Sequence, residues 1–383
     1  MKHPRHSKQE TSQDTVASLA ALSSVCRTKC IVTEYEEDMR WKKWIHRLTL
    51  VSTISVAAVV PAADAQQPAF KVLYAERINL DTTLKVMLDF GTGVRHPFVV
   101  DTGSVGIVVP ESELPRSVKK AAAGSIRYTS SGLVVEGFWT EPIDVKLDVS
   151  GAIAHVPVFA ATSSTCVQPS SNSCNPGSLP RMMGIGFGRP ESYASPDRNP
   201  LIQIANLPSG TPSNYRITHF GIDLGIVNAE NIEGMHTMRL KNFTRHGLSE
   251  QSVTDYRTPT GTIRVNDGRR QHASILIDTG ITDALIALDR GEPSGCLPLT
   301  PAPGVNCTVN DGTKFTVSML DGAAKLSFVA SDHTKTTPSS AHWIHLSRQE
   351  GNFINTGIRP LARFDIFYDD TNGLFGLSPA RLY

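Results

Sequence analysis

Short apolar runs, each only a few residues long, alternate along this chain with clusters of glycine, asparagine, proline and serine. The segments SGLVVEGF (131–138) and TVSML (316–320) are typical, because β-branched or aromatic side chains fill the run and turn-forming residues bound it. Apolar positions at helical spacing are scarce, and one short helix-like run lies between Pro- and Ser-rich flanks in 195–214. The pattern predicts an all-β protein.

Two of the apolar runs lead into the same tripeptide. FVVDTGSVGIVVP (98–110) and SILIDTGITDALIAL (274–288) each pass from apolar residues into Asp-Thr-Gly and then into a second apolar run. A single Asp-Thr-Gly is usually a turn, because Asp and Gly both suit turn positions. Its repetition 177 residues further on predicts two related β units, each delivering one aspartate, Asp101 or Asp278, at the end of a strand.

The repetition divides most of the chain into two expected lobes. Residues 66–210 form the N-terminal lobe, with the first Asp-Thr-Gly and a Gly/Ser-rich hairpin that contains Tyr128. Residues 211–383 form the C-terminal lobe, with the second Asp-Thr-Gly. A separation of 177 residues leaves enough chain for one β domain around each tripeptide.

The charges of the chain are balanced, with 37 Lys and Arg against 36 Asp and Glu among 383 residues. No strong electrostatic field therefore favours nucleic acid or an anionic membrane. The chain also has no basic cluster with interleaved aromatic residues. We expect no nucleic-acid partner.

Residues 39–65 have the three parts of a secretory signal peptide. The segment 39–47 is rich in basic residues, 48–63 is apolar, and Ala-Asp-Ala at 63–65 matches the small-x-small cleavage pattern before Gln66. The apolar stretch is short for a membrane span, although an uncleaved anchor is the alternative. We expect a secreted or periplasmic protein whose mature form has no stable membrane span.

Residues 1–38 form a polar leader that ends in the acidic run EYEED. We expect translation to begin at Met39, which would make this leader a misassigned start. Two of the six cysteines, Cys26 and Cys30, lie in it.

The other four cysteines, Cys166, Cys174, Cys296 and Cys307, allow three pairings. Two short loops, each bounded by two of them, favour local disulfides between Cys166 and Cys174 and between Cys296 and Cys307. An oxidising compartment permits such bridges. Neither loop has the C-x2-C spacing that is typical of a zinc site, so we expect no metal there.

Two carboxylates that face each other can do chemistry that one cannot. Like charges about 3 Å apart resist joint ionisation, so Asp101 and Asp278 would share one proton. The ionised partner can act as a general base on water, and the protonated partner can donate a hydrogen bond to a carbonyl oxygen. Thr102 and Thr279 can hydrogen-bond across the axis between the two loops and hold them in register.

Five segments, in order, resemble the pepsin-like aspartic proteases. They are FGTGVRHPFVVDTGSVGIVVP (90–110) and ILIDTGITDALI (275–286) for the two active-site loops, SIRYTSSGLVVEG (125–137) for the flap, MMGIGFGRP (182–190) for the apolar-Gly strand, and LARFDIFYDDTNGLFGLSP (361–379) for the closing strands. The resemblance implies the bilobal pepsin-like acid protease fold, with two β-barrel-like lobes and the active-site cleft between them. It also implies an extended peptide or protein substrate and no metal or organic cofactor.

Within this resemblance, Asp101 and Asp278 are the catalytic pair and Tyr128 is the flap tyrosine over the cleft. The residues expected to support the pair are Thr102, Gly103, Ser104, Thr279 and Gly280. Asp101 lies 35 residues after Gln66, which is about the length of mature chain that the resemblance implies before the first active-site loop. The resemblance therefore implies no room for an inhibitory prosegment, and we expect no zymogen stage. One chain carries both halves, so a monomer is expected.

Three places depart from the family pattern. Val108 stands where a tryptophan usually hydrogen-bonds the flap tyrosine, and Ile281 stands where a hydroxyl usually donates to the second aspartate. A carboxylate without that donor should have a raised pKa, so we expect a less acidic activity profile than that of a typical pepsin. Asn355-Thr356-Gly357 stands where two apolar residues usually precede the glycine, so this strand is expected to pack differently.

The first hypothesis is a secreted aspartic endopeptidase that hydrolyses peptide bonds with a water molecule activated by the paired aspartates. The alternative is a non-catalytic binding or inhibitor protein on the same fold, which Val108 and Ile281 favour. A serine hydrolase lacks the G-x-S-x-G motif here, and HWIH (342–345) lacks the H-E-x-x-H pattern of a zinc protease.

Overall fold

The computed structural model describes residues 67–128, 130–167, 174–189, 195–243, 254–289, 305–344 and 351–381, with the backbone alone at 230 and 305–307. This part of the chain consists of strands, turns and short 3-10 helices, so the expectation of an all-β protein is confirmed. None of its helices is long and apolar enough to cross a membrane. The expected leader (1–38) and signal peptide (39–65) lie outside the described residues, as do Cys296 and the side chain of Cys307.

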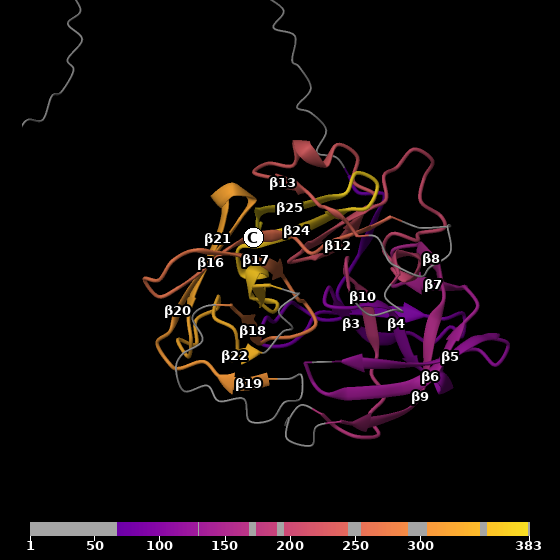
Figure 1. Cartoon of the computed structure of the whole chain (residues 1–383). Helices are drawn as coiled ribbons and strands as arrows, with labels where there is room; N and C mark the ends of the chain where they lie inside the picture. The colour runs from indigo at the N-terminus through magenta and orange to yellow at the C-terminus, as the bar shows by residue number, and fades with distance from the viewer. Residues whose placement is uncertain are drawn as a thin grey trace, which may run out of the picture. The chain divides into compact units, whose positions relative to one another are not determined.

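A nine-stranded sheet carries the first Asp-Thr-Gly (Figure 1). In spatial order its strands are β5 (Lys120–Tyr128), β6 (Leu133–Thr140), β9 (Val158–Cys166), β4 (Val105–Pro110), β10 (Met182–Ile185), β3 (His96–Asp101), β2 (Lys85–Asp89), β7 (Ile143–Leu147) and β8 (Ala152–Val156). Every residue of β4 is buried, which is why its sequence is a nearly continuous apolar run and does not alternate with polar residues.

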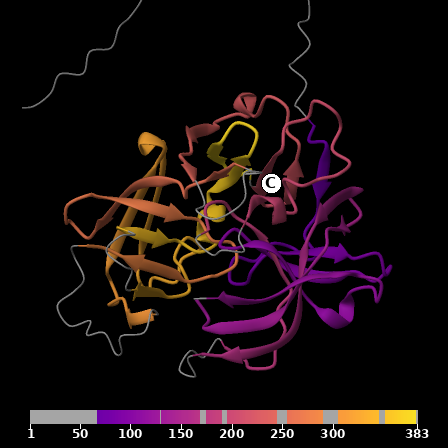
Figure 2. The same ribbon diagram turned by 45° about the vertical axis from the view of Figure 1, so that its right-hand side comes forward.

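An eight-stranded sheet carries the second Asp-Thr-Gly and lies beside the first sheet in both views (Figures 1 and 2). In spatial order its strands are β19 (Val305–Thr308), β22 (Ala341–Ile344), β18 (Ala284–Ala287), β23 (Phe353–Asn355), β17 (Gln271–Leu276), β16 (Thr260–Val265), β20 (Lys314–Met319) and β21 (Ala324–Val329). Both large sheets are curled, which is compatible with a bilobal β fold.

The two large sheets repeat one five-strand arrangement. In the first sheet, β9–β4–β10–β3–β2 are joined by parallel, antiparallel, parallel and antiparallel pairing, in that order. In the second, β22–β18–β23–β17–β16 follow the same sequence of pairings. The coarse twofold repetition in the sequence is therefore a repetition of strand topology, and each Asp-Thr-Gly follows the corresponding strand, β3 or β17.

A six-stranded sheet takes strands from both expected lobes. Its order is β1 (Phe70–Val72), β12 (Gly221–Leu224), β11 (Asn214–Thr218), β24 (Phe364–Asp369), β25 (Leu374–Pro379) and β13 (His236–Arg239). The expected boundary near residue 210 falls in the connection between β10 and β11. The remaining elements are the β14 (Asn242–Phe243) and β15 (Asp255–Tyr256) pair and five 3-10 turns: η1 (Glu111–Glu113), η2 (Pro196–Arg198), η3 (Ala229–Asn231), η4 (Leu320–Gly322) and η5 (Arg359–Ala362). In 195–214 the only helical element is η2, which lies in the N-terminal flank of this segment, and Ile204 makes an isolated β-bridge to Ala154, so the expected helix-like run forms no helix.

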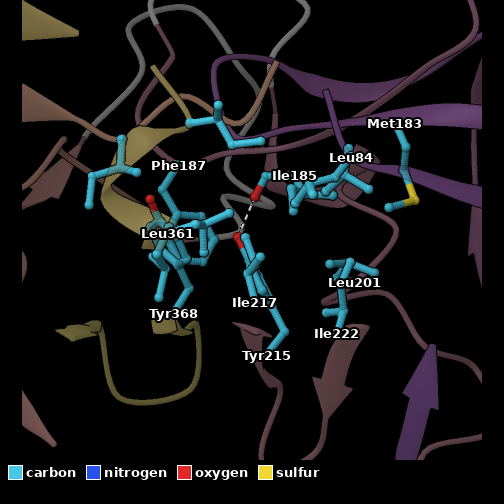
Figure 3. Close-up of a cluster of buried hydrophobic side chains, with 14 of the residues drawn as sticks. Leu84, Met183, Ile185, Phe187, Leu201, Tyr215, Ile217, Ile222, Leu361 and Tyr368 are labelled. Atoms are coloured by element: carbon cyan, nitrogen blue, oxygen red, sulfur yellow. Dashed lines mark hydrogen bonds between the residues drawn. The ribbon is translucent and has the colours of Figure 1, made fainter. Parts of the chain in front are cut away.

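Buried side chains of the six-stranded sheet pack against β10, which lies next to the strand that ends at Asp101. Tyr215 on β11 is fully buried, stacks on Tyr368 with ring centroids 5.3 Å apart, and donates its hydroxyl hydrogen to the carbonyl of Ile185 at the end of β10 (Figure 3). Met183 and Ile185 lie in the same core. Because β10 is the parallel neighbour of β3, this core fixes the strand that lies against the loop of Asp101.

The predicted disulfide between Cys166 and Cys174 is confirmed. Cys166 is the last residue of β9, and its cross-strand partner is Leu133 of β6. The bridge therefore closes the chain directly after the strand that supports the β5–β6 hairpin. The other predicted bridge, between Cys296 and Cys307, involves side chains outside the described residues.

Candidate active site

Strand ends bring Asp101 and Asp278 into the interior. Asp101 is the last residue of β3, and Asp278 lies two residues beyond the end of β17. Their side chains are only 5 % and 6 % exposed. Gly103 and Gly280, two residues further along each loop, are partly exposed, so the two buried carboxyls lie directly beneath segments that reach the surface.

Each loop lies against the carboxyl group of the other. A Cβ atom added to Gly103 would lie 2.5 Å from Oδ2 of Asp278, and a Cβ atom added to Gly280 would overlap Oδ1 of Asp101. Only glycine leaves room for such an approach. The two carboxyl groups therefore face each other across the axis between the loops.

Thr102 and Thr279 make the cross-loop hydrogen bonds that the sequence predicts. The amide N–H of Thr102 donates to Oγ1 of Thr279 over 3.1 Å, and the amide N–H of Thr279 donates to Oγ1 of Thr102 over 3.0 Å. Each hydroxyl in turn donates to a carbonyl of the opposite half, that of Ile277 at 2.5 Å and that of Val100 at 2.7 Å. Both threonines are fully buried, so this four-bond network lies in the interior and holds the two loops in register.

Two donors hold the Asp101 carboxyl. The amide of Gly103 donates to Oδ1 over 2.7 Å, and the hydroxyl of Ser104 donates to Oδ2 over 2.5 Å. The Ser104 contact is the supporting role expected of that hydroxyl, whereas the Gly103 amide is a donor that the sequence does not predict. They fix the plane of the carboxyl group and favour its ionised form.

The Asp278 carboxyl is also held by two donors, but the second comes from a different strand. The amide of Gly280 donates to Oδ1 over 2.9 Å, and Nδ2 of Asn355, at the end of β23, donates to Oδ2 over 2.7 Å. The expectation that Ile281 leaves this carboxylate without its side-chain donor is therefore wrong. The stated reason for a less acidic activity profile does not hold.

The environment of Asp101 favours its protonated form. Burial raises the pKa of the Asp101 carboxyl well above its usual range, and the negative charge of Asp278 raises it further. The hydrogen bonds from Ser104 and Gly103 act in the opposite direction but do not cancel these effects. Two facing carboxyls in this state can hold one proton between them, which belongs to the pair and not to either residue.

Tyr128 ends β5 and packs against a small apolar group, here called the hairpin cluster: Val108, Ile126, Val135, Trp139, Phe159 and Ala161. Trp139 on β6 packs edge-on against Phe159, with ring centroids 5.3 Å apart, and the guanidinium of Arg198 lies 3.9 Å from the centre of the Trp139 ring. An indole therefore lies in the same cluster as Val108 but comes from the hairpin and not from the loop after Asp101. The role of Tyr128 over a cleft stays a prediction.

Within the described ranges, no group of three or more His, Cys, Asp or Glu side chains is placed to hold a metal ion. No protein-family model matches the chain, and no curated protein matches its sequence at a significant level. The chemistry of the site must therefore be inferred from its own geometry.

Asn355 donates to the aspartate pair, a role that the sequence patterns do not predict. The sequence does carry a signal, since a polar residue stands at 355 where apolar residues are usual and a hydroxyl is missing at 281. The two departures compensate for each other: Asn355 donates to Asp278 in place of the hydroxyl that Ile281 lacks.

Proposed function

We propose that this protein is an aspartic endopeptidase with the pepsin-like fold. The observation that carries the proposal is the pair of buried, facing carboxyls of Asp101 and Asp278, held by matched donors at the ends of equivalent strands. The repeated five-strand arrangement of the two large sheets supports the fold assignment. The β5–β6 hairpin, with Tyr128 at the end of its first strand, is the candidate flap.

The pair would act on an amide bond with one shared proton. The ionised carboxylate takes a proton from a water molecule, and the resulting hydroxide equivalent attacks the carbonyl carbon. The protonated carboxyl donates a hydrogen bond to the carbonyl oxygen as negative charge develops there. Collapse of the tetrahedral intermediate breaks the C–N bond, and the amine leaves with a proton supplied by the pair.

The surroundings of the pair suit this chemistry. Burial and the charge of Asp278 raise the pKa of Asp101, so one carboxyl of the pair stays protonated at pH values where an isolated aspartate would be ionised. The threonine network keeps the separation of the two loops fixed while charge moves between them. The proposed substrate is an extended peptide or protein segment, and no cofactor is required.

A secreted or periplasmic location is part of the same proposal. The Cys166–Cys174 disulfide supports it, because such bridges persist in oxidising compartments.

Cleavage of a denatured protein mixture by the purified protein tests the proposal. Assays from pH 3 to pH 7, with and without pepstatin, would be run beside Asp101→Asn, which keeps the shape of the side chain but cannot hold the charge. We expect pepstatin-sensitive cleavage that the variant lacks. Folded wild-type protein that cleaves nothing at any of these pH values would contradict the proposal and favour the alternative, a non-catalytic binding protein.

A further inference from the structure

The strand repetition identifies the counterpart of Asn355 in the first half. On β10, Met182 pairs with Val99, two residues before Asp101, and on β23, Asn355 pairs with Leu276, two residues before Asp278. Met182 and Asn355 therefore occupy equivalent places beside the two loops. The methionine packs against the hairpin cluster, whereas the asparagine donates to a carboxylate.

Both ends of the Asn355 carboxamide are engaged, so its orientation is fixed. Nδ2 donates to Oδ2 of Asp278 over 2.7 Å, while Oδ1 accepts the amide N–H of Gly357 over 2.9 Å. The side chain is only 4 % exposed. Because the oxygen is occupied by an N–H donor, only the –NH2 group can face the carboxylate, and it can only donate.

Ile281 stands where the first loop has Ser104, three residues after the aspartate. Its carbonyl accepts the amide N–H of Ile358 over 3.0 Å, which ties its backbone to the segment just after Gly357. Its side chain has no hydrogen-bonding atom. The donor to the outer oxygen of the second carboxylate must therefore come from elsewhere, and Asn355 provides it.

We propose that Asn355 is the positioning residue for Asp278 and does for the second carboxylate what the Ser104 hydroxyl does for the first. This inference rests on the proposed function. It makes the pair chemically unequal: the serine hydroxyl that faces Asp101 can donate or accept, whereas the –NH2 group that faces Asp278 can only donate. A donor at Oδ2 of Asp278 disfavours a proton on that oxygen and favours placing the shared proton on another oxygen of the pair.

The first test compares the pH–activity profiles of Asn355→Leu and the wild-type protein on a denatured protein substrate. A hydrogen bond to a charged group is worth enough to change kcat by roughly ten- to a hundredfold, and we expect a loss of that size with KM little changed. Loss of a donor to the ionised carboxylate also moves the acidic limb of the profile upward by about one pH unit. Adding Ile281→Ser to this variant should recover part of the lost kcat and reverse part of the pH shift, because it places a hydroxyl at the position equivalent to Ser104.

The isosteric Asn355→Asp provides a readout that does not need activity. In the folded state the introduced carboxyl must stay protonated to donate to Asp278, so its pKa is raised and the free energy of unfolding falls as pH rises from 4 to 7. Asn352→Asp is the matched control, because Nδ2 of Asn352 donates to the His272 carbonyl at 2.9 Å and Oδ1 accepts the Asp289 amide, with no carboxylate as partner. We expect the control to lose less stability as pH rises, because its new carboxyl faces a carbonyl oxygen and not a second carboxylate, and we expect its activity profile to be unshifted.

The outcomes separate the inference from the proposed function. Wild-type protein that cleaves nothing overturns the proposed function, while the stability measurement still decides whether Asn355 holds Asp278. Wild-type protein that cleaves, together with Asn355 variants that behave like Asn352→Asp in both measurements, overturns the role of Asn355 alone.

Discussion

The two Asp-Thr-Gly loops share a backbone design and differ in one side-chain contact. In both loops, the backbone amide two residues after the aspartate donates to one of its carboxyl oxygens. The threonine of each loop is hydrogen-bonded to the threonine of the other. The other carboxyl oxygen is served by Ser104 from within the first loop, but by Asn355 from strand β23 in the second half. The number of donors is the same, although the chain supplies the second one from different places.

The difference shows which part of the design is constrained. A buried carboxylate that is ionised in part of the proposed reaction needs donors, since an unpaired buried charge costs several kcal/mol. The need for a donor does not determine which type of residue supplies it or where that residue stands in the sequence. It requires only that a strand end place a donor against the carboxyl oxygen. The backbone contacts have no such freedom, because only the loop itself can supply them.

The largest expected effect tests whether the two halves are chemically interdependent. Asp101→Asn and Asp278→Asn should each reduce kcat/KM by about a thousandfold or more, because the pair needs one proton and one negative charge and either variant removes that state. Initial rates on a peptide substrate, with circular dichroism to verify folding, measure this. A variant that keeps a tenth of the wild-type rate would show that one aspartate suffices.

The second prediction concerns the close approach of each loop to the opposite carboxyl. Gly103→Ala and Gly280→Ala each place a methyl group against that carboxyl, so we expect roughly a hundredfold lower kcat from its displacement. Gly91→Ala is the control for backbone strain, since its φ is 86° and an added Cβ would meet nothing within 4 Å. Equal activity in Gly91→Ala and the two loop variants would contradict a steric cause.

The third prediction is that the threonine network stabilises both halves equally. Thr102→Val and Thr279→Val each leave one buried N–H and one buried carbonyl without a partner, which should lower the free energy of unfolding by about 2–4 kcal/mol. Thr140→Val is a one-bond control, because its buried hydroxyl accepts only the Val158 amide, at 3.0 Å, and it should cost about half as much. Urea unfolding measures all three. Unequal losses for Thr102 and Thr279 would show that one loop depends more on the network than the other.

The fourth prediction concerns a feature of the first half. Replacing Cys166 and Cys174 by alanine opens a loop that spans 8 residues of sequence separation, and the chain-entropy model gives a loss of about 2.5 kcal/mol. Unfolding curves of the wild-type protein with and without reductant, beside the double variant, test this. A reductant effect that persists in the double variant would have to arise from other cysteines.

Local patterns suffice to predict much of this molecule. The all-β class, the two aspartates, the threonine crossing and the Cys166–Cys174 bridge each depend on residues that are close in sequence or repeated in it. The contact of Asn355 with Asp278 spans 77 residues and depends on the parallel register of β23 with β17, which no local pattern specifies. The same holds for Trp139, whose place beside Phe159 follows from the pairing of β6 with β9.

The prediction with the smallest expected effect concerns a buried carboxyl outside the aspartate pair. It distinguishes the titration of the pair from that of other buried carboxyls. Burial raises the pKa of Asp365, on β24 of the six-stranded sheet, to about 6, and its side chain is 3 % exposed. The raised value stabilises the folded state below about pH 4, where this carboxyl is protonated in both states, and that stability is lost as pH rises through 6.

Asp365→Asn keeps the shape of this side chain and cannot ionise, so we expect it to raise the free energy of unfolding at pH 7 by about 1 kcal/mol, a figure reduced for screening by nearby cations. Asp370, whose pKa burial also raises to about 6, should leave a residual slope between pH 4 and 7 in this variant. Unfolding at five pH values, with cleavage assayed in parallel, measures both effects. If the variant has a flatter stability curve but an unchanged pH–activity profile, the pH dependence of cleavage arises in the two loops. A shifted activity profile would show that the charge of Asp365 in the six-stranded sheet influences the titration of the aspartate pair.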